Sequence, residues 1–272
     1  MNENTPTPPP PISPADAAER LAAKMAETST PTSTPPPIPR GPRQLGDDPA
    51  EHIPITNIIG AIDAILRHPR RVMFQLRGAG AGKLIGMMVM VSVLCSLIYG
   101  VVVGTFSMSD QLWAAPAKIT MGMMISALIC LPSLYIFTCL SGSQARLVEI
   151  CGLLGGLLML MTVLLIGFAP AAWIFSESSE SIQWMGALHL IFWFVATFFG
   201  LRFLEAGFAQ SQARSHAGFN TWVIIFLLVS VQMTTALRPI IGKADAFLPT
   251  QKQFFLSHWV ECMQINGRAN GR

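Results

Sequence analysis

The chain has 272 residues, of which 51% are hydrophobic and 12% are charged, whereas about 25% of residues are charged in an ordinary soluble domain. This low charge fraction, with several long apolar runs, argues against a large soluble core and for a membrane protein. The formal net charge is +3. Because the basic excess lies beside apolar runs, where it sets topology, we expect no nucleic-acid partner.

Residues 1–54 hold 14 of the 20 prolines. A segment so poor in apolar residues cannot offset the entropy lost on ordering, so we expect a disordered cytoplasmic tail with polyproline II character. A transient helix over residues 15–27 is its one expected interruption. Two roles for the tail stay open: a tether or ligand for a proline-binding module, or an inert spacer.

Residues 55–83 predict two short amphipathic helices. Apolar residues of the first recur at helical spacing: Ile55, Ile58, Ile59, Ile62 and Leu66. After the break expected at His68 and Pro69, a second apolar stripe runs beside Arg70, Arg71 and Arg77. Such basic segments before a transmembrane helix are typical of interfacial helices on an anionic leaflet, and a cap packed on the bundle is the alternative.

The stretch RGAGAGKL at residues 77–84 invites comparison with a phosphate-binding loop. Such a loop needs GxxxxGK followed by Ser or Thr. Here Arg77 occupies the position of the first glycine, and Leu84 follows Lys83. We therefore interpret the stretch as a flexible glycine hinge that leads into the first span.

Five apolar runs predict transmembrane helices. The first, residues 84–106, has 23 residues without a charge, which as a helix is about 35 Å long and can cross a bilayer. The other spans are expected at residues 119–140, 150–175, 184–201 and 222–237. The sequence therefore predicts an all-α, multi-pass protein of a bacterial inner membrane, with its five-helix transmembrane domain at residues 84–242.

The flanks of these runs predict the orientation. Basic residues gather before the first span and in the loops on that side, so the positive-inside rule places the N-terminus in the cytoplasm and the C-terminus outside. Residues 243–272 are expected to be an extracytoplasmic tail with a short amphipathic helix. Tryptophans are expected in belts at the two membrane boundaries, with Trp113, Trp173 and Trp184 outside and Trp222 inside.

Two GxxxG patterns, Gly100 with Gly104 and Gly152 with Gly156, allow close approach of helix backbones. We expect them to pack helices within one chain, and dimerisation is the alternative. At the cytoplasmic end of the third span, Glu149 is expected to pair with Arg146, three residues before it.

Polar groups within the spans are few: His189, Gln232 and, at the end of the fifth span, Arg238. Burial of such groups costs free energy unless each finds a partner, so they should face the bundle interior. They form either a polar pathway or ligand pocket, or hydrogen bonds between helices, with Arg238 reaching the outer headgroups.

The sequence contains no motif for chemistry. HExxH, GxSxG, a pair of aspartates within the spans, CxxC and a Cys/His cluster are all absent. We therefore expect no enzyme activity, no catalytic residue, no cofactor and no metal site.

The layout, a proline-rich N-terminal region followed by five helices and an outside C-terminus, resembles the Yip1 family, whose eukaryotic members bind small GTPases in vesicle traffic. The sequence also resembles bacterial multi-pass proteins often labelled "actin-binding WH2 domain-containing", over about residues 55–265. The matching residues are Tyr99-Gly100, residues 130–135, Ala169-Pro170, Gly200-Leu201, Gln232-Met233, residues 237–239 and Gly242. No LKKT-like stretch follows an amphipathic helix, so actin is not an expected partner.

The sequence thus predicts a non-catalytic integral membrane protein that binds other membrane proteins as a scaffold, assembly factor or accessory subunit. The alternative is a small transporter or channel subunit with a polar path near His189, Gln232 and Arg238. A water-accessible cavity at these side chains would favour transport, and a dry packed interior would favour the scaffold. Five spans without an internal repeat favour the scaffold as well.

Overall fold

The computed structural model describes residues 13–27, 45–105, 111–178, 182–210 and 217–236. The chain divides into two units, Met1–Arg43 and Gln44–Arg272. In the first unit the structure describes α1 (Pro14–Glu27), at the place where the sequence predicts a helix. The rest of the predicted proline-rich tail, at residues 1–12 and 28–44, and the tail helix predicted within residues 243–272 lie outside the described residues.

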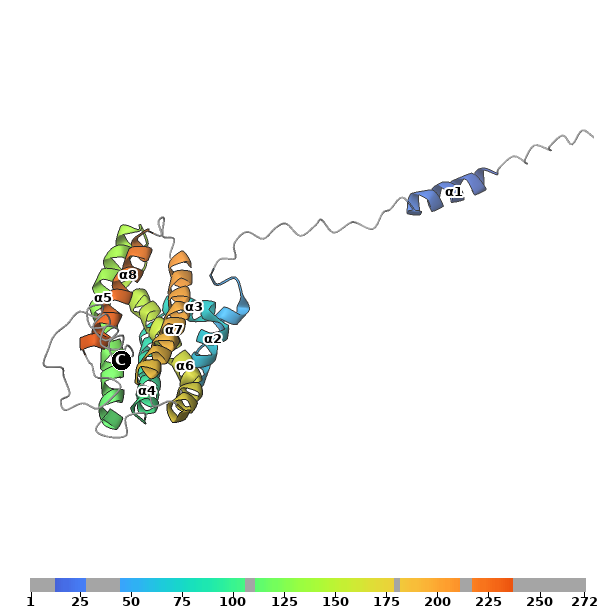
Figure 1. Cartoon of the computed structure of the whole chain (residues 1–272). Helices are drawn as coiled ribbons and strands as arrows, with labels where there is room; N and C mark the ends of the chain where they lie inside the picture. The colour runs from blue at the N-terminus through green and yellow to red at the C-terminus, as the bar shows by residue number, and fades with distance from the viewer. Residues whose placement is uncertain (1–12, 28–44, 106–110, 179–181, 211–216, 237–272) are drawn as a thin grey trace, which may run out of the picture. The chain divides into compact units, whose positions relative to one another are not determined.

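The second unit is dominated by a bundle of five long helices (Figure 1). They are α4 (Ala81–Thr105), α5 (Gln111–Leu140), α6 (Leu147–Ser178), α7 (Ile182–Gln210) and α8 (Ala217–Ala236). Each contains a stretch that is long and apolar enough to cross a membrane. The prediction of an all-helical chain with five such helices is therefore confirmed, and these are the features of a multi-pass membrane protein.

Several of these helices are longer than the apolar runs that predicted them. Helix α5 begins at Gln111 rather than at residue 119, and α7 continues to Gln210 rather than ending at residue 201. Hydropathy detects the part of a helix that matches the lipid core, whereas the backbone stays helical beyond it. In consequence Lys118 lies on a helix and not in a loop.

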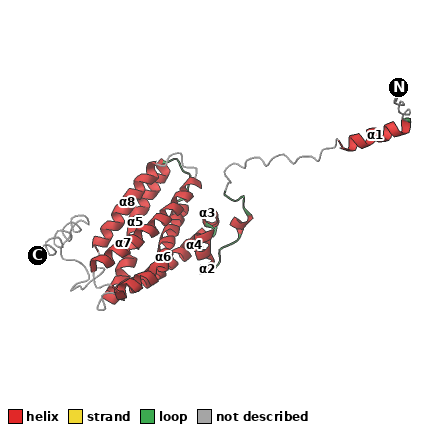
Figure 2. Cartoon of the chain, turned by 45° about the vertical axis from the view of Figure 1, so that its right-hand side comes forward, coloured by secondary structure: helices red, strands yellow, loops and turns green. Residues whose placement is uncertain are grey.

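The neighbouring helices α4 and α5 run in opposite directions, as two contacts between them show. The hydroxyl groups of Ser96 and of Thr120 on α5 are 2.9 Å apart, and Gly100, later on α4, faces Pro116, earlier on α5. Helix α4 packs between α5 and α6, while α7 packs mainly on α6 and α8 mainly on α5. Figure 2 shows these helices and the cap in a second view. The main contacts thus follow the order α8, α5, α4, α6, α7.

Helix α6 is the most enclosed of the five. In its most apolar stretch 72% of the residues are buried, against 22% for α8. Neighbouring helices therefore cover most of the apolar surface of α6, whereas α8 turns most of its apolar surface outward, as a membrane span can. The side chains that fill this centre include Leu157, Met159, Met161 and Leu165.

The helices α2 (Ile58–Arg67) and α3 (Pro69–Leu76) form a cap on α4 and α6, which is the alternative that the sequence left open. Their buried faces include Ala64, Ile65 and Leu76. The outer face of α2 leaves Ile59 79% exposed. The interfacial placement therefore stays a prediction for that outer face.

The packed part of the cap also includes residues 45–54, which the sequence assigns to the disordered tail. A 3₁₀ turn (Pro49–His52) carries Glu51, whose side chain is 5% exposed. Its carboxylate accepts hydrogen bonds from the backbone N–H of Gly46 at 2.5 Å and from Nε of Arg70 at 2.6 Å. A buried ion pair orders this segment, and proline content alone gave no sign of it.

The tryptophans of the two predicted belts differ in their exposure. Trp113, Trp173 and Trp184 lie at one end of the bundle and are exposed. Trp222 is fully buried, donates its indole N–H to the carbonyl of Cys130 at 3.0 Å and stacks on Phe226. The prediction of an inner belt at Trp222 is therefore wrong, because its polar N–H is satisfied by α5 rather than by a membrane boundary.

Glycines mark the closest helix crossings. A Cβ atom at Gly100 would overlap the backbone of Pro116 on α5. At Gly156 it would lie 2.5 Å from the ring of Phe203 on α7, and at Gly152 it would overlap Leu76 of the cap. Both patterns thus contain a glycine at a contact within the chain, and Gly104 is also buried.

We expect Gly100→Ala to lower the melting temperature of the detergent-solubilised protein. The added methyl group meets backbone, which cannot rotate away, and overpacking costs about 1–3 kcal/mol, more than the roughly 1 kcal/mol gained in helix propensity. Gly86→Ala on the same helix is the matched control, because nothing lies within 4 Å of its Cβ position. Equal melting temperatures for the two variants would show that this crossing does not limit stability.

Candidate functional site

Most hydroxyl groups inside the spans bond to their own helix. Ser92 donates to the carbonyl of Met88 at 2.8 Å, and Thr138 donates to that of Leu134 at 2.6 Å. Thr162 does the same with Leu158 at 3.0 Å. A bond to the preceding turn satisfies a hydroxyl without water and without another helix. These hydroxyl groups therefore need no partner from another helix.

Besides Ser96 and Thr120, a second polar side-chain pair joins two different spans. The hydroxyl of Tyr99 on α4 and Nδ1 of His189 on α7 are 2.7 Å apart, and their rings meet edge to face at 5.7 Å. Which of the two atoms donates depends on the histidine tautomer. Tyr99 is 4% exposed, so this hydrogen bond lies inside the bundle. It is the cross-helix partner that burial of His189 demands.

Two polar atoms of α7 are buried without a hydrogen-bond partner in the described part of the chain: Nε2 of His189 and Oγ1 of Thr197. Leaving such an atom unsatisfied costs about 1–3 kcal/mol. Native proteins tolerate few of these, and each requires an explanation. These two atoms are therefore the strongest indication of a polar function in the interior.

The structure does not assemble the whole predicted path. Gln232 is half-buried on α8, which packs mainly on α5, whereas His189 belongs to α7, which packs mainly on α6. Arg238 lies outside the described residues. The hydrogen bond of His189 goes to Tyr99, which the sequence analysis did not select because tyrosine is common in apolar runs.

Lys118 is a further residue that sequence reasoning missed. Its side chain is fully buried within α5. An ionisable residue inside a span is by default a candidate for function, since its burial is costly. In the sequence Lys118 directly precedes the apolar run at residues 119–140. Hydropathy therefore assigned Lys118 to the loop before the second span.

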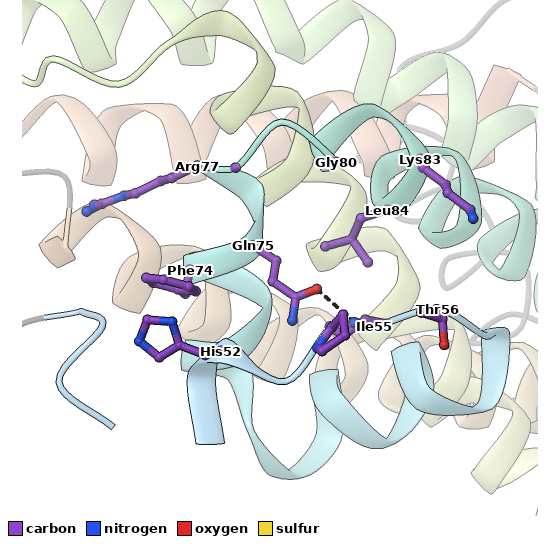
Figure 3. Close-up of a pocket in the computed structure, with 11 residues that line it drawn as sticks. His52, Ile55, Thr56, Phe74, Gln75, Arg77, Gly80, Lys83 and Leu84 are labelled. Atoms are coloured by element: carbon purple, nitrogen blue, oxygen red, sulfur yellow. Dashed lines mark hydrogen bonds between the residues drawn. The ribbon is translucent and has the colours of Figure 1, made fainter. Parts of the chain in front are cut away.

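A cavity of about 520 Å³ lies where the cap meets the start of α4 (Figure 3). The amide of Gln75 closes one wall: its oxygen accepts from the N–H of Ile55 at 2.9 Å, and its nitrogen donates to the carbonyl of Ile53 at 2.5 Å. The stretch predicted as a glycine hinge forms another wall, but only residues 77–80 lie between α3 and α4, because Lys83 and Leu84 belong to the first turn of α4. In the sequence, the glycine-rich stretch marked this region, although it did not predict a cavity.

Arg77 ties the end of α3 to two spans. Its guanidinium donates to the carbonyl of Gln210 at 2.7 Å, and its Nε is 3.8 Å from the carboxylate of Glu149. The predicted pair of Glu149 with Arg146 is therefore wrong. The cap arginine reaches the carboxylate because α3 packs against the first turn of α6.

Comparison of the chain with protein-family models, with curated proteins and with solved structures found no match. Within the described residues, no group of three or more His, Cys, Asp or Glu side chains is placed to hold a metal ion. The five apolar helices define the class of the chain as a multi-pass helical membrane protein.

We expect Tyr99→Phe to lower the melting temperature, because it removes the partner of Nδ1 of His189. Hydrogen bonds between membrane helices contribute about 0.6–1.7 kcal/mol. Tyr135→Phe is the control, since this other tyrosine lies on the exposed side of α5. The effect of Tyr99→Phe should shrink in a His189→Phe background. An undiminished effect there would show that the hydroxyl acts through something other than the histidine.

Proposed function

We propose that the chain is a non-catalytic integral membrane protein that binds other membrane proteins as a scaffold, assembly factor or accessory subunit. The observation that supports this best is the apolar packing of the interior. Apolar side chains of α6 fill the centre, and several hydroxyl groups of the spans bond to their own helices. Such an interior offers little room for a substrate path, so the outer faces of the helices carry the function.

Helix α8 is the favoured surface for a partner. It packs mainly on α5, and only 22% of its most apolar stretch is buried. Ile224 and Leu228 project from its open side and are 68% and 54% exposed. A helix held on one side only has the largest free face on which a helix of another protein can pack.

We further propose that the protein lies in a bacterial inner membrane with the cap in the cytoplasm. The cap and the start of α4 carry five basic residues at one end of the bundle: Arg67, Arg70, Arg71, Arg77 and Lys83. That excess supports a cytoplasmic placement under the positive-inside rule. The expected partners are the bilayer and other membrane proteins, with neither nucleic acid nor actin among them.

Photo-crosslinking in native membranes tests the scaffold proposal. A benzophenone amino acid in place of Ile224 or Leu228 should give a discrete adduct with another protein, identified by mass spectrometry. The matched control is Phe226 on the same helix, which is 2% exposed and should crosslink only within the chain. Phe198, which is exposed on α7, samples a second outer face of the bundle. If benzophenone at Ile224, Leu228 and Phe198 gives adducts with lipid alone, the proposal fails.

A small transporter or channel subunit is the second candidate. The observation that favours it is the pair of unpartnered buried atoms on α7, Nε2 of His189 and Oγ1 of Thr197. Water or a small polar substrate would supply the missing hydrogen bonds if it entered the bundle there.

Thiol labelling separates the two candidates. In a cysteine-free background, a charged methanethiosulfonate reagent should leave Thr197→Cys unlabelled, because Thr197 is 1% exposed and its surroundings are dry. Asp63→Cys on the outer side of α2 is the control and should react rapidly. Comparable labelling rates at the two positions would overturn the dry interior and favour the transporter.

A further inference from the structure

The residues that line the cavity between the cap and α4 indicate its depth relative to the membrane. Leu84, which lines it, is the first residue of the uncharged run at residues 84–106, and Lys83 is the last charge before that run. A span that begins here changes from water to hydrocarbon at this level. The cavity is therefore at the membrane–water boundary.

The lining combines apolar walls with positive charge. Ile55, Phe74 and Leu84 provide apolar surface. Arg77 and Lys83 lie at opposite edges of the cavity, and in Figure 3 their side chains point away from each other. None of the 11 lining residues is acidic. A ligand that fits this lining carries a negative group and an apolar body.

The two cations differ in availability. The guanidinium of Arg77 is already engaged by the carbonyl of Gln210 and by Glu149. Lys83 is exposed in the first turn of α4 and forms no ion pair within the described residues. An incoming anion therefore meets its strongest unmatched charge at Lys83.

The walls of the cavity are held in place without a ligand. His52 packs edge to face on Phe74, with ring centroids 4.5 Å apart. Arg71 donates to the backbone carbonyls of Ile53 at 2.8 Å and Pro54 at 3.2 Å. A preformed site loses little entropy on binding, which favours affinity.

We propose that this cavity binds one anionic phospholipid, with its phosphate at Lys83 and its glycerol region against the apolar wall at Leu84. A volume of about 520 Å³ is within the usual range for ligand sites and suits a headgroup, while the acyl tails stay in the bilayer. Charge complementarity and the level of the cavity select a lipid over a soluble phosphate, which has no apolar part for the walls. The inference does not depend on the scaffold proposal.

Native mass spectrometry of the full chain tests this site. The protein is purified in neutral detergent with phosphatidylcholine and titrated with phosphatidylglycerol. One phosphatidylglycerol molecule should be retained in preference to phosphatidylcholine. Inorganic phosphate, added as a separate arm at millimolar concentration, should not displace it.

Charge variants locate the binding. Lys83→Gln should weaken phosphatidylglycerol binding about tenfold, as expected for loss of one charge-assisted hydrogen bond, and Lys83→Arg should restore it. Arg67→Gln is the control, because it removes the same charge from an exposed position on α2 that does not line the cavity. It should bind like the unaltered chain.

A filling variant tests the cavity itself without changing charge. Gly80 lines the cavity and has nothing within 4 Å of its Cβ position, so Gly80→Leu should fold normally and lose the lipid. Gly86→Leu on α4 is equally unobstructed but does not line the cavity, and it should keep the lipid. Because this pair is independent of Lys83, it decides the question even where a charge variant fails to fold.

Three results would overturn the proposal. Equal retention of phosphatidylglycerol and phosphatidylcholine would mean that the cavity does not select charge. Equal binding by Lys83→Gln and Arg67→Gln, or by Gly80→Leu and Gly86→Leu, would place the lipid elsewhere on the molecule. Displacement of the lipid by inorganic phosphate would assign the site to a soluble phosphate compound.

Discussion

In a bilayer no hydrophobic force draws one apolar helix towards another, because lipid tails are as apolar as the helices themselves. The bundle therefore depends on how closely its backbones fit together, and α6 is where that fit is most complete. Glycines at its contacts let Leu76 of the cap and Phe203 of α7 approach the helix axis. Each such contact gains dispersion energy that a larger side chain would exclude. Each of the other four spans packs mainly on one or two neighbouring spans.

The same setting makes every polar atom informative. With no water in the hydrocarbon region, a hydroxyl bonds to its own helix or finds a neighbour. Ser92 and Thr138 take the first course, and Tyr99 with His189 takes the second. The cap follows different rules, because it can retain charges: Glu51 is buried against Arg70, while the exposed cations gather beside the first span. Polar chemistry is thus concentrated at one end of the bundle.

Long apolar runs made the all-helical, five-span architecture predictable, because twenty or more such residues have few other stable structures. The ends of the helices were not predictable from hydropathy, which is why Lys118 was assigned to a loop. Contacts between distant segments left no local pattern: nothing near Tyr99 indicates His189, and nothing near Arg77 indicates Glu149. The choice of an inner belt for Trp222 failed for the same reason, since the partner is the carbonyl of Cys130.

The docking of the cap on α6 has a consequence for the order of synthesis. Residues 58–76 leave the ribosome well before Gly152 and Gly156, the contacts that receive them. At about 5–20 residues per second, the 80 residues from Leu76 to Gly156 take roughly 4–16 s to appear. Throughout that delay the apolar stripes of α2 and α3 have no α6 to cover them. Until the third span has been synthesised, the nascent chain therefore exposes the two apolar faces that this span later covers.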